Sequence, residues 1–176
     1  KSQPVPQVAI LLDSTSYLTV SPRVYAPWAG EYEALEGMLH AVLEAGHAAD
    51  VLEDHQLPWQ QDHWPLIVLP EWEHVPPAVV YELVEYVRRG GSLLITGAVT
   101  AGLFREHLNV SFDGAPTEQD ARVQVEPRMT RGGARGGEGG AVTISGPWQN
   151  VSLVPGAPRK VQVIAWRTPG FSESVG

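Results

Sequence analysis

The densest group of chemically competent side chains in the sequence is Glu71-Trp72-Glu73-His74. Two carboxylates and an imidazole this close together are the residue types used for acid–base cleavage of glycosidic bonds. The Trp72 indole is suited to stack on a sugar ring while its neighbours bind hydroxyl groups. The competing interpretation is a solvated loop with Trp72 packed on a neighbouring domain, because loops of this kind are polar by default. We favour this second interpretation for each single residue.

A second candidate is Asp13-Ser14-Thr15-Ser16, which directly follows an apolar run, a position where α/β sheets often bind phosphate or sugar groups. Asp13 is also typical of a turn or cap residue, and we favour that role. If the chain is an enzyme, we expect its acid–base set to be Asp13, Glu71, Glu73 and His74. Otherwise none of these residues is catalytic.

Composition excludes several classes of chemistry. The 176 residues include no cysteine, which removes disulfides, zinc–thiolate sites and thiol nucleophiles. The segment around His74 lacks the His-Glu-x-x-His spacing, and no Gly-x-Gly-x-x-Gly is present, so we expect no metal and no cofactor. A net charge of −8 argues against nucleic acid as a partner. No apolar run is long enough to span a membrane. We expect a soluble chain, either cytoplasmic or exported.

Residues 1–110 alternate short apolar runs with helical periodicity, which predicts an α/β fold. Because the runs are continuously apolar, we expect a doubly wound, mostly parallel sheet flanked by helices. Loops at the carboxyl ends of its strands would form a ligand crevice, which Asp13–Ser16, Glu71–His74 and Gly97–Thr100 would line. The expected strands are 8–12, 49–52, 66–69 and 92–96.

Two helices are expected between these strands. The first starts near Glu31 and ends at Gly46, and the second opens at Pro76-Pro77 and ends at Gly90-Gly91. The periodicity of the second predicts an inner face of Val80, Leu83, Val84 and Val87. A shorter helix follows the last strand, and Thr100 is placed to cap it.

Residues 111–176 differ from the first region in charge and pattern. Residues 106–176 carry seven basic and seven acidic side chains, whereas residues 1–105 carry a net charge of −8. Alternation at 121–126, 141–145 and 160–165 predicts half-exposed antiparallel strands. The glycine-rich stretch 132–140 predicts a mobile loop, because it lacks the glycine–lysine–hydroxyl ending of a phosphate-binding loop. No element at the C-terminal end closes the fold, so the native polypeptide is expected to continue.

Three segments, 33–52, 64–71 and 83–97, carry a resemblance to a known family, most specifically through Tyr86-Val-Arg-Arg-Gly-Gly-Ser-Leu-Leu-Ile-Thr-Gly97. They resemble the class I glutamine-amidotransferase-like superfamily, in the version found as the middle, trimerisation domain of bacterial β-galactosidases and related glycoside hydrolases. The resemblance covers residues 7–110 and implies an amidotransferase-like or flavodoxin-like sheet. Residues 111–176 resemble, more loosely, the β-rich extension of such proteins.

Amidotransferases of this fold use a cysteine on a tight strand-to-helix turn, supported by histidine and glutamate. Here the corresponding strand ends at Gly97 and is followed by Ala98, and the chain has no cysteine, so glutaminase chemistry is excluded. Ser14 or Thr100 would need an adjacent base to act as a nucleophile, and no histidine is near either in sequence. Capping explains Thr100 without a catalytic role.

Tryptophan is frequent, and four of the six tryptophans fall in predicted loops, where aromatic side chains often mark interfaces or carbohydrate platforms. These four are Trp28, Trp59, Trp64 and Trp72. The candidate ligand or interface residues are Ser14, Tyr25, Trp28, Trp72 and Thr100.

The resemblance implies a non-catalytic module of a larger carbohydrate-active enzyme, a glycoside hydrolase, that serves subunit or domain assembly and lines a sugar site. Its partners would be a catalytic barrel domain or other subunits of the parent protein, together with carbohydrate. Two alternatives stay open. One is a free-standing sugar-acting enzyme that uses the acid–base set above, and the other is a carbohydrate-binding or sensor domain.

Overall fold

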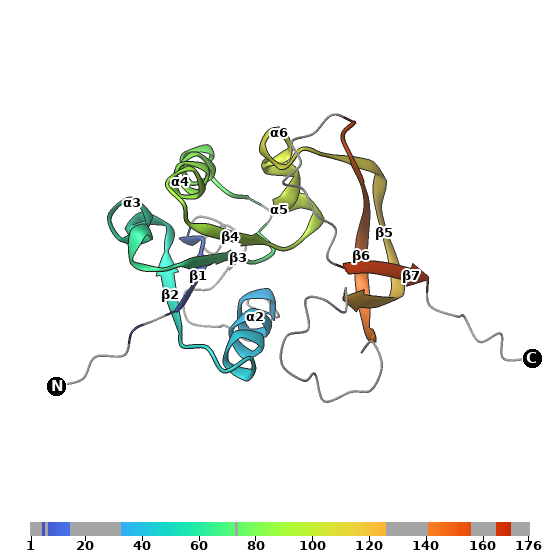
Figure 1. The fold of residues 1–176 in the computed structure, drawn as a ribbon, viewed down its shortest axis with the longest axis horizontal. Helices are drawn as coiled ribbons and strands as arrows, with labels where there is room; N and C mark the ends of the chain where they lie inside the picture. The colour runs from blue at the N-terminus through green and yellow to red at the C-terminus, as the bar shows by residue number, and fades with distance from the viewer. Residues whose placement is uncertain are drawn as a thin grey trace, which may run out of the picture. The chain divides into compact units, whose positions relative to one another are not determined.

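The computed structural model describes residues 5, 7–14, 33–72, 74–125, 141–155 and 165–169. The chain divides into two units, residues 1–107 and 108–176, and each is described by itself. The first unit contains the strands β1 (Val8–Leu12), β2 (Ala49–Glu53), β3 (Leu66–Leu69) and β4 (Ser92–Ile95), shown in Figure 1. Its helices are α2 (Glu33–Glu44), α3 (Leu57–Gln60), α4 (Pro77–Arg88) and α5 (Ala98–Leu103), with 3₁₀ turns η1 (Asp54–Gln56) and η2 (Gln61–His63) on either side of α3.

The four strands form a parallel sheet in the order β2-β1-β3-β4. This confirms the predicted α/β fold and the predicted parallel pairing. From β1 the chain moves to one side to form β2. It then crosses back to the other side of β1 to form β3 and continues outward to β4. The switch in direction therefore falls between β1 and β3, where sheets of this type bind ligands beyond the carboxyl ends of the strands.

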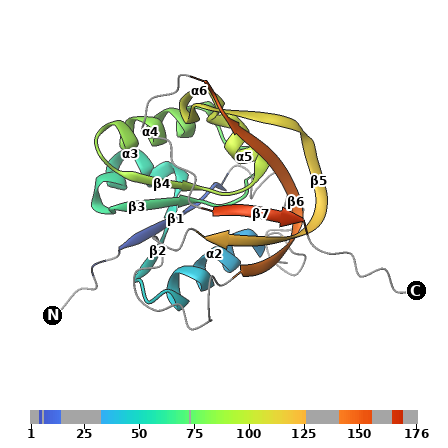
Figure 2. The same cartoon turned by 45° about the vertical axis from the view of Figure 1, so that its right-hand side comes forward.

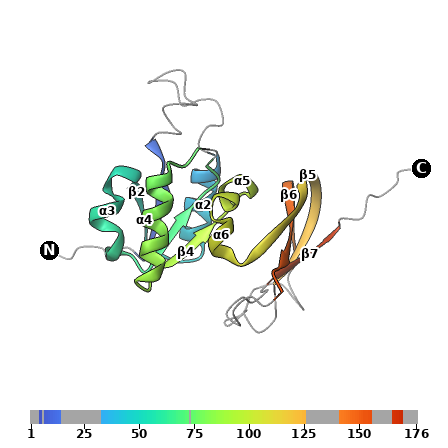
Figure 3. The same ribbon diagram turned by 90° about the horizontal axis from the view of Figure 1, so that it is seen from above.

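The two central strands form the core because they are apolar on both faces. Ile10, Ile67 and Val68 have no exposed surface. Figure 1 shows α4 on one face of the sheet and α2 on the other, and in Figure 3 the sheet is seen from the side of α4. The residues of α2 that pack on Val8, Ile10 and Val68 are Leu35, Met38, Leu39 and Val42.

Glycines end both long helices, as the sequence predicts. Gly46 has a φ of +81° after α2, and Gly90 has a φ of +104° after α4, a backbone region that other residues rarely adopt. The predicted inner face of α4 is confirmed at Leu83 but is otherwise wrong. Val79, Leu83 and Tyr86 are its buried residues, whereas the Val87 side chain is 43% exposed. The interacting stripe is thus rotated by about one residue from the predicted one.

The second unit contains a long antiparallel hairpin. Strand β5 (Val110–Val125) pairs with β6 (Ala141–Leu153) on one side and with β7 (Ala165–Pro169) on the other. Figure 2 shows the two long strands side by side. Residues 121–125 of the predicted strand 121–126 fall within β5, and the predicted strand 141–145 falls within β6, while Glu126 lies outside the described residues. The glycine-rich stretch 132–140 and most of 160–165 lie outside the described residues.

Helix α6 (Arg105–Leu108) joins the first unit to β5 along the chain. Within the described residues, no helix has the length and apolarity needed to cross a membrane.

Candidate functional site

The carboxyl ends of β1 and β3 lie beside each other, so the loops that follow them meet at the switch in strand order. A hydrogen bond across this point joins the two loops, from the Trp72 indole Nε1 to the Leu11 carbonyl, at 2.9 Å. Trp72 is only 8% exposed. The buried indole therefore lies at the switch point, where α/β sheets of this type usually hold a ligand.

This placement corrects the sugar-platform interpretation of Trp72. A buried indole presents no open face to stack on a sugar, so the predicted sugar platform is absent at this residue. Trp64 is buried as well, at 6% exposure, and Trp59 is the large exposed exception at 83%. Trp28 and Tyr25 lie outside the described residues.

Thr100 holds the backbone of Trp72 in place. Its hydroxyl accepts a hydrogen bond from the Trp72 amide and donates one to the Trp72 carbonyl, both at 2.9 Å. The predicted cap is therefore wrong. The N-cap of α5 is Gly97, without a side-chain cap, and Thr100 lies inside the helix with no exposed surface. Because its proton is donated to a carbonyl rather than to a base, this hydroxyl is not arranged as a nucleophile.

The strand-to-helix turn after β4 carries no reactive group. It is made by Gly97 and Ala98, and Gly97 has a φ of +87°. A Cβ added to Gly97 would lie 2.7 Å from Cγ of Glu71, so the Glu71 side chain covers the turn closely. Backbone conformation and space both require glycine here. The turn after β4 is therefore built from small residues without a nucleophilic side chain.

Ser14 belongs to a different contact at the same edge of the sheet. Its hydroxyl donates to Oδ1 of Asp54, which follows the neighbouring strand β2, at 2.6 Å. His55 Nδ1 lies 3.1 Å from Oε2 of Glu53 and 4.0 Å from Oδ1 of Asp54. Ser14 thus donates to a carboxylate and not to a histidine that could act as its base. The hydroxyl is therefore not arranged as a nucleophile. Asp54 is not among the predicted site residues, although its position directly after β2 indicates this edge.

The members of the predicted acid–base set differ in their exposure. Asp13 has no exposed surface, whereas Glu71 and His74 are exposed, and Glu73 lies outside the described residues. Asp13 and His74 both have interaction partners in the folded chain. In the part of the chain that the structure describes, no three His, Asp or Glu side chains are placed to hold a metal ion.

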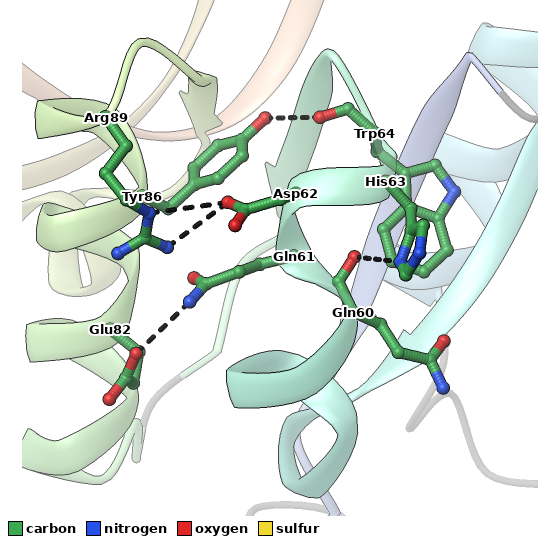
Figure 4. A network of polar contacts seen from close by, with 8 residues as sticks. All are labelled: Gln60, Gln61, Asp62, His63, Trp64, Glu82, Tyr86 and Arg89. Atoms are coloured by element: carbon green, nitrogen blue, oxygen red, sulfur yellow. Dashed lines mark hydrogen bonds and ion pairs between the residues drawn. The ribbon is translucent and has the colours of Figure 1, made fainter.

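A polar network lies at the opposite, amino edge of the sheet (Figure 4). Tyr86 on α4 donates its hydroxyl proton to the Trp64 carbonyl at 2.9 Å, and Arg89 Nη2 lies 3.3 Å from Oδ1 of Asp62. Burial is the main reason why the pKa of Tyr86 is raised above its ordinary value of 10.0. The network surrounds an open hollow of about 620 Å³, lined by Asp62, His63, Trp64, Pro65, Tyr86, Arg89, Gly90 and Gly91.

No protein-family model and no curated protein sequence matches the chain. Solved structures do share its fold. An α-L-fucosidase, isoenzyme 2, from Paenibacillus thiaminolyticus is 16% identical, with a TM-score of 0.65 over 94% of this chain and 23% of that one. The exo-β-1,4-mannosidase Op5Man5 from Opitutaceae bacterium strain TAV5 is 12% identical, with a TM-score of 0.58 over 85% and 26%.

A β-galactosidase from the psychrophilic Marinomonas ef1 is 17% identical, with a TM-score of 0.56 over 93% of this chain and 24% of that one. The chain thus spans about a quarter of the length of each of these three proteins. The similarity concerns the fold of a part that recurs within larger glycoside hydrolases.

Proposed function

We propose that this chain is a non-catalytic, amidotransferase-like module of a larger carbohydrate-active enzyme, in which it serves domain or subunit assembly. The observation that carries the proposal is the closed switch point. The indole of Trp72 occupies it through the Leu11 carbonyl, and Thr100 fixes the Trp72 backbone from α5. A site filled by the protein's own core has no room for a substrate at the position where this fold normally acts.

The chemistry of the surrounding groups supports the same proposal. The turn after β4 lacks a nucleophile, and the hydroxyls of Ser14 and Thr100 are donated to a carboxylate and a carbonyl. An acyl- or glycosyl-transfer site needs a nucleophile or an acid–base pair aimed at a common space. The recurrence of this fold as about a quarter of three glycoside hydrolases supports the carbohydrate context and a catalytic domain as partner.

The test is an activity assay on the purified 176-residue chain with aryl α-L-fucosides, β-D-mannosides and β-D-galactosides. The proposal predicts no hydrolysis above a buffer blank. Turnover that disappears in Glu71→Gln or His74→Ala would instead establish the free-standing enzyme. Titration with the three free sugars, followed by tryptophan fluorescence, separates the remaining alternative. A binding or sensor domain would show saturable quenching, whereas an assembly module shows none.

A further inference from the structure

The sequence contains one Asp-Gly step, Asp113-Gly114, and no Asn-Gly step. The short side chain of an aspartate reaches the backbone of the next residue, and a glycine there has no Cβ to hinder the approach. The backbone nitrogen of the glycine can then attack the carboxyl carbon and close a five-membered imide. In a folded chain this reaction requires an exposed step and a backbone that is free to turn.

The Asp113-Gly114 step lies at the irregularity in the hairpin of β5 and β6, the two long strands in Figure 2. Asp113 pairs with Asn150 on β6. The next pair is Thr117 with Trp148, so the ladder skips Gly114 and the two residues after it. Gly114 has a φ of +72°, and both residues of the step are exposed. The ladder with β6 therefore does not hold the Gly114 nitrogen in the plane of the sheet.

Two serines hold the Asp113 carboxyl group. Ser152 on β6 donates its hydroxyl proton to Oδ2, and the hydroxyl oxygen of Ser111 lies 3.4 Å from Oδ1. Ser111 and Ser152 are paired with each other in the ladder, on the side of Asp113 that faces the start of β5. The carboxyl group is thus drawn towards the start of the strand and away from Gly114. The bond from Ser152 must break before Cγ can turn to the Gly114 nitrogen.

The peptide group between Asp113 and Gly114 is polarised by Gln149. The Nε2 atom of Gln149 donates to the Asp113 carbonyl at 2.8 Å and to the Gly114 carbonyl at 3.0 Å. A hydrogen bond to a peptide carbonyl draws electron density from its nitrogen, so it makes the Gly114 N–H more acidic. The same bond makes the Asp113 carbonyl carbon a better target for water once the imide has formed.

We propose that Asp113 is a site of covalent self-modification, at which the chain converts aspartate to isoaspartate at a rate limited by the Ser152 hydroxyl. In the first step the Gly114 nitrogen forms a bond to Cγ of the protonated carboxyl group. The bond from Cγ to its hydroxyl group breaks, and this hydroxyl leaves with the amide proton as one molecule of water.

The second step opens the imide with water. Water adds to the former Asp113 carbonyl carbon, the bond from that carbon to the Gly114 nitrogen breaks, and the main chain then continues through Cβ and Cγ. Opening at Cγ instead restores aspartate. Isoaspartate adds one methylene group to the main chain at the last regular pair before the irregularity, so the pairing of Asp113 with Asn150 is lost.

The first test follows the unmodified full chain during several weeks at neutral pH and physiological temperature. Proteolytic peptides are separated by chromatography, and electron-transfer fragmentation distinguishes isoaspartate from aspartate. Asp120 is the internal control, because it is also exposed on β5 but pairs regularly with Ser145 and precedes the buried Ala121. We expect isoaspartate to form several times faster at Asp113 than at Asp120. Equal rates, or none at Asp113, would overturn the proposal.

The second test compares Ser152→Ala with Ser145→Ala, each of which removes one hydroxyl from an exposed residue of β6. Ser152→Ala is expected to raise the rate at Asp113 several-fold and to leave the rate at Asp120 unchanged. Ser145→Ala should leave the rate at Asp113 unchanged. An unaltered rate at Asp113 in Ser152→Ala would show that this hydroxyl does not limit the reaction. A rise at both aspartates would show that the hairpin had opened, and would equally contradict the role of the hydroxyl.

Discussion

The hydroxyl oxygen of Thr100 lies 2.9 Å from both the amide nitrogen and the carbonyl oxygen of Trp72, twenty-eight residues away in the chain. A single side chain thus satisfies both backbone groups of a buried residue. It joins the helix after β4 to the loop after β3, and so holds the indole over the end of β1. This arrangement places a buried indole at the switch point of the sheet.

Replacement of Thr100 by valine tests the contact. Valine keeps the shape but leaves the amide and carbonyl of Trp72 buried without a partner, so we expect the free energy of unfolding to fall by about 2–4 kcal/mol. Thr100→Ser keeps the hydroxyl and should cost less than half as much. Urea denaturation measures both variants. Equal stability of the valine variant and the unmodified chain would show that the two bonds are dispensable.

Replacement of Trp72 by phenylalanine removes the indole N–H that donates to the Leu11 carbonyl and leaves most of the ring volume. We expect a loss of about 1–3 kcal/mol in the free energy of unfolding, because a buried carbonyl loses its partner. Trp59→Phe is the matched control, since that side chain is 83% exposed, and should change stability by less than about 0.5 kcal/mol. Similar losses in both variants would contradict the burial of Trp72.

Three glycine-to-alanine variants separate backbone strain from helix propensity. Gly97 has a φ of +87° and lies against Glu71, so Gly97→Ala is expected to destabilise the chain by about 1–3 kcal/mol. A Cβ at Gly91 would lie 2.1 Å from Cζ of Tyr86, so Gly91→Ala must displace that ring. Gly37 lies in α2 with open space around it, and Gly37→Ala should stabilise by about 0.5–1 kcal/mol. Thermal unfolding of the three variants measures these changes in stability.

Stability is expected to depend on Tyr86 at alkaline pH. Burial raises its pKa in the folded chain above the ordinary value of 10.0, so the unfolded chain loses the phenolic proton first. The free energy of unfolding should therefore fall as the pH rises above about 10 and through the folded pKa. Tyr86→Phe should be less stable than the unmodified chain at pH 8, because it lacks the bond to the Trp64 carbonyl, and the difference should shrink towards pH 11. A constant difference over this range would contradict the shift.

Local patterns in the sequence predict much of the fold. The central strands are continuously apolar because helices cover both faces, and Gly46 and Gly90 end helices because the backbone there needs a positive φ. Strand β5 shows where such patterns fail. It begins at Val110, well before the predicted start at residue 121. Between Asp113 and Thr117, β5 has three residues where β6 has one, and this irregularity interrupts the alternating pattern in the first part of the strand.

The candidate site was harder to predict because its contacts join distant parts of the chain. Thr100 follows a strand by a few residues, which is typical of a helix cap, and only the packing of α5 on the Trp72 loop gives it another role. Trp72 stands among polar residues and resembles an exposed loop aromatic. Its indole bonds to the carbonyl of Leu11, on a strand that is distant in sequence but adjacent in the sheet.

The most direct test of the closed switch point is the Trp72 indole N–H signal in the NMR spectrum, assigned by its loss in Trp72→Phe. The account predicts slow exchange of this proton with water and an unchanged chemical shift at millimolar fucose, mannose or galactose. Rapid exchange together with a saturable shift on addition of one sugar would show an open, occupied site and would contradict the account.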